Sequence, residues 1–176
     1  GRIEADDFDG NAESLKGYVS LLHGEAPVYQ LFANKNQEFD AIVTYINQCL
    51  EAGIRANDIC VASYRNDSVD SIANYLTRNA GIPCRLWNRD DKDGVHAYTF
   101  HRMKGLEFRV VILADVSAGT IPYRAGNYNE LDDEQKRQID QSQRSLMYVA
   151  LTRAINRVFI TGCGEPSSFL TSLAKK

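Results

Sequence analysis

The sequence has few of the features that mark membrane or metal proteins. It contains no apolar run near the ~18 residues that a membrane-spanning helix needs, and no stretch typical of a secretion signal. Its three histidines, His23, His96 and His101, are scattered, so we expect no catalytic metal cluster. We therefore expect a cytoplasmic protein that does not contact a membrane.

Paired cysteines and a strong basic charge are also missing. The four cysteines show no CxxC or Cys/His ligand spacing, and we expect them to be small buried hydrophobes in a reducing compartment. The net charge of −3 argues against a nucleic-acid platform that extends over the whole chain. A local basic patch remains compatible with this charge, because net charge says little about one face.

The sequence lacks the usual phosphate-binding and nucleophile motifs. It has no GxxxxGK[ST], no GxGxxG after a strand and no GxSxG. The apolar run "VVILADV" is similar to a metal-binding strand, but Asp115 is followed by Val116 rather than by a second acid. The chain therefore has no phosphate cradle of its own.

What is present describes one globular domain. The chain has 176 residues, of which 44% are apolar and 24% charged. Residues 1–23 are expected to be a lead-in segment, in which Gly17 weakens a possible short helix over Glu13–Leu22. Residues 24–176 are expected to form the domain.

Apolar runs of strand type alternate with helical patterns along this domain. Strands are expected at 27–33, 58–64, 81–87, 110–114 and 157–163. Helices are expected from 37 to about 50, after a cap at Asn66 or Asp67, through 142–156, and over 167–175. A polar stretch at 88–94 reads as hairpin-like. This order predicts an α/β fold with a mainly parallel sheet.

Sites in such sheets gather at the carboxyl ends of the strands. The sequence therefore directs attention to Tyr64–Arg65, to the region after Asp115 and to Gly162–Ser167.

One arginine continues an expected apolar stripe. Leu146, Val149 and Arg153 follow helical spacing, so Arg153 would lie on the core-facing line of its helix. Such an arginine pairs with an acid, extends to solvent, or points its planar donor fork at a phosphate in a cleft. The pattern alone leaves these readings open.

Two long motifs in order carry a family resemblance. "TFHRMKGLEFRVVIL" (99–113) followed by "LMYVALTRA" (146–154) resembles motifs V and VI of superfamily 1 UvrD/Rep-type DNA helicases. "ICVASYR" (59–65) resembles motif IVa, and "GEPSSFL" (164–170) is similar to the end of the C-terminal domain in bacterial members. The resemblance runs from about Gly24 to Leu170. It implies the second RecA-like domain, a three-layer P-loop NTPase fold without its own P-loop.

The resemblance also implies partners. The second domain of an ATP-dependent DNA helicase pinches ATP against an N-terminal RecA-like domain, which would mainly hold the ATP and Mg²⁺. Single-stranded DNA, or its junction with a duplex, would be the other partner. The chain alone is expected to be inactive as an ATPase. The alternative is a non-enzymatic, helicase-like adaptor that binds nucleic acid or protein.

Position by position, the resemblance implies several roles. Arg153 would be the catalytic arginine finger, and it would bind ATP together with Glu107, Lys104 and Gly105. Thr99, His101 and Arg65 would face the DNA strand. Arg144 and Tyr148 would support motif VI.

Plainer readings exist for the same residues. Lys104 and Glu107 could pair on the surface, His101 could be a core-edge histidine, and Arg65 could have no role. Trp87 and Tyr98 are expected to be packing residues rather than base-stacking platforms.

Two departures from the family pattern stand out. Arg102 and Met103 replace small residues between the histidine and lysine of motif V, which adds a cation near the DNA side. The interval from Asn79 to Ala97 is too short for the accessory domain that several members insert there.

Overall fold

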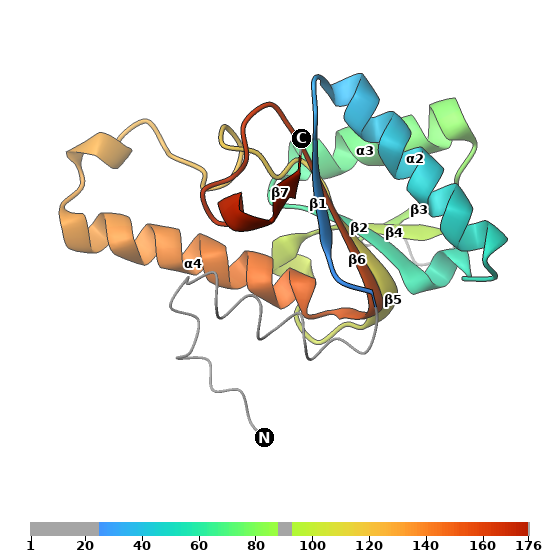
Figure 1. The fold of residues 1–176 in the computed structure, drawn as a ribbon. Helices are drawn as coiled ribbons and strands as arrows, with labels where there is room; N and C mark the ends of the chain where they lie inside the picture. The colour runs from blue at the N-terminus through green and yellow to red at the C-terminus, as the bar shows by residue number, and fades with distance from the viewer. Residues whose placement is uncertain (1–24, 88–92, 176) are drawn as a thin grey trace.

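The computed structural model describes residues 25–87 and 93–175, and these form three layers around one sheet. The sheet has seven strands in the order β3-β4-β2-β5-β6-β1-β7, and every neighbouring pair is parallel. Helices α2 and α3 lie on one side of the sheet and α4 on the other (Figure 1). The predicted α/β class with a parallel sheet is confirmed. The helix suggested at Glu13–Leu22 lies outside the described residues.

The strands and helices alternate as the sequence suggests. The strands are β1 (Val28–Phe32), β2 (Ile59–Ser63), β3 (Cys84–Leu86), β4 (Val95–Thr99), β5 (Phe108–Leu113), β6 (Ala154–Cys163) and β7 (Ala174–Lys175). The helices are α2 (Lys35–Glu51), α3 (Asn66–Ala80) and α4 (Asp133–Leu151). None of the helices in the described ranges is long and apolar enough to cross a membrane.

The sheet buries both of its faces, as parallel sheets do. In β5, Val110 and Ile112 belong to the core under α2 and α3, whereas Val111 and Leu113 belong to the core under α4. Successive residues of a strand face opposite sides of the sheet, and here both sides are buried. The central strands therefore appear in the sequence as unbroken apolar runs. Every residue of β2 is buried.

The helix of motif VI is shorter than predicted. The sequence suggested a helix through residue 156, but α4 ends at Leu151 and β6 begins at Ala154. The predicted stripe of Leu146, Val149 and Arg153 is therefore wrong, since Leu146 and Val149 are only partly buried. Ala154 pairs with Phe108 of β5, and this non-local pairing ends the helix before Arg153.

Three further local predictions were wrong. The 167–175 helix is instead a short 3₁₀ turn at Thr171–Leu173 followed by β7, which pairs with the edge of β1. The hairpin-like stretch predicted at 88–94 lies mostly outside the described residues, but the strands on either side of it, β3 and β4, run parallel and so do not form a hairpin; β4 takes the direction of β2, against which it is buried. Helix α3 begins after Arg65, without a side-chain cap.

Because all strands point the same way, the sheet has one amino edge and one carboxyl edge. The residues that directly follow β2, β3, β4 and β5 lie at the carboxyl edge, and the residues before β5 and β6 lie at the opposite edge. The candidate functional residues divide between these two edges.

Candidate functional site

Glu107 and Arg153 lie next to each other at the amino edge. Each directly precedes a strand, and the residues that follow them, Phe108 and Ala154, are paired in the sheet. The backbone N–H of Phe108 donates a 2.9 Å hydrogen bond to the carbonyl oxygen of Arg153. From the strand pattern we expected functional sites at the carboxyl ends of the strands. Glu107 and Arg153 instead lie at the opposite, amino edge of the sheet.

Arg153 is held by the end of α4. Its Nε donates to the carbonyl oxygen of Val149 at 3.1 Å, and its Nη2 donates to Oγ1 of Thr152 at 3.1 Å. The carbonyl end of a helix favours a cation. Among the described residues Arg153 makes no ion pair with an acid. The structure therefore does not support the reading of a paired core arginine.

The loop before β5 exposes three of the predicted nucleotide contacts. Lys104, Gly105 and Glu107 are exposed, while Met103 and Phe108 on either side are buried. Gly105 has φ of +82°, a conformation that side chains with a Cβ disfavour. In the described part of the chain Lys104 and Glu107 form no ion pair with each other. The loop is thus anchored at both ends and leaves its polar groups available.

The predicted DNA contacts lie at the carboxyl edge. Arg65 follows β2, and Thr99 and His101 lie at the end of the neighbouring strand β4. His101 is exposed, and its ring lies 5.2 Å from that of Tyr64, so it is not a core-edge histidine. Thr99 is only 7% exposed, which limits its contact with a polymer to the cavity that it lines.

Two aromatic residues that the sequence reasoning did not assign complete this surface. The guanidinium of Arg65 lies 5.0 Å from the ring centre of Tyr123, and the rings of Tyr64 and Tyr123 are 6.5 Å apart. Together with Asn66, Asp67 and His101 they line a cavity of about 490 Å³. Burial, then the nearby Tyr123, raises the pKa of Tyr64. Tyr64 stands inside motif IVa, whereas Tyr123 lies in a loop that carries no sequence signal.

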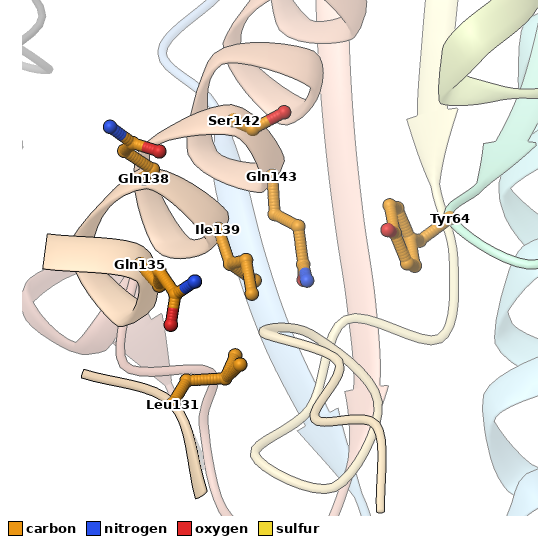
Figure 2. Close-up of a pocket in the computed structure, with 7 residues that line it drawn as sticks. All are labelled: Tyr64, Leu131, Gln135, Gln138, Ile139, Ser142 and Gln143. Carbon is orange, nitrogen blue, oxygen red and sulfur yellow. The ribbon is translucent and has the colours of Figure 1, made fainter. Parts of the chain in front are cut away.

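A second cavity continues on the other side of Tyr64. It has a volume of about 480 Å³ and is lined by Tyr64, Leu131, Gln135, Gln138, Ile139, Ser142 and Gln143. Figure 2 shows the side chains of α4 on one side of this space and Tyr64 on the other. The two cavities share Tyr64, so they adjoin along the carboxyl edge.

Arg144 and Tyr148, the two residues predicted to support motif VI, lie on the core side of α4. The guanidinium of Arg144 lies 4.7 Å from the ring centre of Phe169, and its Nε is buried without a hydrogen-bond partner among the described residues. Tyr148 is buried, and burial raises its pKa. Its carbonyl oxygen accepts a hydrogen bond from the N–H of Thr152, next to Arg153.

A buried polar network at the carboxyl ends of β5 and β6 was also missed. Glu38 is fully buried and accepts hydrogen bonds from the N–H of Asp115 (2.8 Å) and from Oγ1 of Thr161 (2.7 Å). Lys35 forms an ion pair with Asp115 and lies 3.5 Å from Glu38. Burial disfavours the charge of Lys35, but the two acids outweigh burial and raise its pKa.

Comparisons with known proteins find similarity to DNA helicases. Residues 86–165 match the family described as the UvrD-like helicase C-terminal domain. The chain is 32% identical over 108 residues to the ATP-dependent DNA helicase PcrA of Staphylococcus aureus (strain Mu50 / ATCC 700699), a match that covers 58% of this chain and 14% of that protein. It is 28% identical over 120 residues to PcrA of Leuconostoc citreum, covering 61% of this chain and 15% of that protein. The chain therefore spans only a small fraction of these relatives.

A solved structure matches the whole fold. The C-terminal domain of a possible DNA helicase from Lactobacillus plantarum WCFS1 superposes with a TM-score of 0.65 at 16% sequence identity. The match covers 94% of this chain and 96% of that one. At this level of identity the likeness establishes the fold, and it agrees with the expected RecA-like domain.

Proposed function

We propose that this chain, which matches the UvrD-like helicase C-terminal domain over residues 86–165, is the second motor domain of an ATP-dependent DNA helicase or translocase that acts in the cytoplasm. One observation carries the proposal. Glu107 and Arg153 stand together at one edge of the sheet, and Arg65 and His101 lie at the opposite edge. One rigid sheet thus separates the surface assigned to nucleotide from the surface assigned to DNA.

The residues at the amino edge suit contact with a nucleotide that is held mainly by another domain. Arg153 has no acidic partner among the described residues, and a planar guanidinium matches phosphate oxygens. An arginine finger in this position stabilises charge that develops in phosphoryl transfer, with effects of about 10³–10⁵ in rate. Glu107 would accept a hydrogen bond from the ribose, and the loop at Lys104 and Gly105 would face the nucleotide.

The phosphate cradle and the metal are assigned elsewhere. Within the described ranges there is no group of three or more His, Cys, Asp or Glu side chains arranged to hold a metal ion. We therefore assign the Mg²⁺ and most ATP contacts to an N-terminal RecA-like domain of the full-length protein. This chain contributes the arginine that completes the site.

The carboxyl-edge residues suit a single DNA strand or its junction with a duplex. Arg65, whose Nε lies 3.0 Å from a carboxylate oxygen of Asp67, supplies a cation that a phosphate would share with that acid. The rings of Tyr64, His101 and Tyr123 supply stacking surfaces for bases. Thr99 contributes from the neighbouring cavity. Closure of the two motor domains on ATP would change the grip of this surface and move the strand.

The alternative is a non-enzymatic adaptor built on a helicase-like domain. This sequence has no P-loop, and an adaptor that does not hydrolyse ATP would not need one. The reading frame upstream of Gly1 separates the two. If it encodes GxxxxGK[ST] and an Asp-Glu metal motif, the adaptor is excluded.

The decisive experiment measures ATP hydrolysis by the full-length protein with and without single-stranded DNA. Arg153→Ala should abolish DNA-stimulated hydrolysis while leaving ATP binding intact, because the finger acts on the transition state. Arg137→Ala is the matched control, since Arg137 is exposed on α4, the helix that ends just before Arg153, and pairs only with Glu134 in the described structure. Normal hydrolysis by the Arg153→Ala protein would refute the finger role.

The 176-residue chain alone provides a second check. It should show negligible ATPase activity, because it has no Walker lysine and no metal-holding acids. Turnover by the highly purified chain that Arg153→Ala does not change would contradict the assignment.

A further inference from the structure

Trp87 is an exposed aromatic residue at the carboxyl edge. It follows β3 and keeps 41% of its surface exposed, so the expectation that it is a packing residue is only partly right. Its ring meets the buried Tyr98 edge-on, with 5.4 Å between the ring centres. The guanidinium of Arg102 lies over the indole at 4.8 Å. Arg102 is one of the two residues in the motif V loop that depart from the family pattern.

A cavity of about 320 Å³ opens between these residues. It is lined by Asn66, Val69, Asp70, Leu86, Trp87, Ala97, Tyr98, Thr99 and Arg102. Asn66 also lines the cavity of Tyr64 and Tyr123, so the two cavities adjoin. The strands that end here, β3, β4 and β2, are consecutive in the sheet. A polymer that crosses His101 therefore has a continuous path to Trp87.

The chemistry of the cavity suits a base better than a phosphate. The guanidinium of Arg102 lies over the indole of Trp87, and this stacked pair is a flat platform of the kind on which bases stack. Val69 and Ala97 are buried and supply an apolar floor. Asp70 would repel a phosphate, whereas its carboxylate can accept a hydrogen bond from the amino group of a base.

We propose that the cavity lined by Trp87, Arg102 and Asp70 is a nucleobase subsite that extends the single-strand track beyond Asn66. This inference rests on the proposed DNA-binding function and adds a position to it. Trp87 and Arg102 line this subsite, and the family resemblance assigns neither of them to DNA.

The test uses the fluorescence of Trp87, the single tryptophan of this chain. The 176-residue chain is titrated with a single-stranded DNA oligonucleotide that carries a fluorescent label for anisotropy. Binding measured by anisotropy should be accompanied by quenching of Trp87 at the same concentrations. Trp87→Ala should weaken binding about 5- to 150-fold, the range expected for loss of one stacked base, and Trp87→Phe should retain most of the affinity.

Matched variants separate this subsite from the rest of the track. Tyr123→Ala should weaken binding but preserve Trp87 quenching at saturation, because Tyr123 lies in the neighbouring cavity. DNA binding without Trp87 quenching overturns the subsite and leaves the proposed function standing. Absence of any DNA binding by the unaltered chain overturns both. The quenching measurement needs no substitution, so it stands even if a variant does not fold.

Discussion

The side-chain amide of Gln143 holds the backbone of Tyr123 at both of its polar atoms. Its Oε1 accepts a hydrogen bond from the Tyr123 N–H at 2.6 Å, and its Nε2 donates one to the Tyr123 carbonyl at 2.8 Å. Gln143 is 5% exposed and belongs to α4. The position of the Tyr123 ring over Arg65 is therefore set by a helix and not by the loop that contains it.

Substitutions of Tyr123, and of Gln143 that holds its backbone, should weaken DNA binding to different degrees. Tyr123→Ala should weaken binding of single-stranded DNA about 5- to 150-fold, through loss of a stacking surface, whereas Tyr123→Phe should bind nearly as well. Gln143→Glu should fall between them, because a carboxylate accepts from the N–H but cannot donate to the carbonyl. Anisotropy titrations of labelled oligonucleotide measure all three. Unchanged affinity of Tyr123→Ala would remove Tyr123 from the track.

Removal of Glu38 should destabilise the domain strongly. Glu38→Ala leaves the N–H of Asp115 and the hydroxyl of Thr161 without their acceptor in a buried place, at a cost of about 3 kcal/mol or more. Glu38→Gln should cost less, since its amide oxygen can still accept. Urea unfolding measures both free energies, and the exposed Glu134→Ala should stay within about 0.5 kcal/mol of the unaltered chain. Equal stability of Glu38→Ala and Glu134→Ala would contradict the role of the network.

Two glycines should respond differently to alanine. A Cβ on Gly162 would lie 2.0 Å from the carbonyl oxygen of Val116, so Gly162→Ala should cost about 3 kcal/mol or more. A Cβ on Gly105 would meet nothing within 4 Å, and only its φ of +82° opposes the change, at about 1–2 kcal/mol. The two unfolding free energies test this order, and a larger loss at Gly105 would reverse it.

His96 should make stability depend on pH. Burial, followed by the charge of Arg85, lowers its pKa below the ordinary value, so the folded protein favours neutral His96. The unfolded chain binds this proton near pH ~6.5, so the contribution is complete above that pH and is lost as the pH falls further. Melting temperatures between about pH 8 and pH 5.5 should decline less for His96→Gln than for the unaltered chain. Identical slopes would count against this cause.

The sequence predicted the elements whose burial follows a local period. The helix expected from residue 37 and the apolar runs of β2 and β5 depend on residues that are close in sequence, and the structure confirms them. The end of α4 could not be predicted this way. The residues around Arg153 suit a helix as well as a strand, and pairing of Ala154 with distant Phe108 decides between them.

The carboxyl-edge surface shows a second limit of sequence reasoning. Tyr98 and Trp87 look alike in sequence, yet Tyr98 is 7% exposed and Trp87 is 41% exposed. Their difference depends on which elements cover each ring. The backbone of Tyr123 is held in place by Gln143, twenty residues later in the chain. Neither relation produces a periodic pattern in the sequence.

The ion pair of Lys35 with Asp115 has a practical consequence for handling the protein. The cation that balances the acids at this end of the sheet is part of the chain itself, beside Glu38. The purified chain should therefore keep its melting temperature when it is dialysed against a chelator.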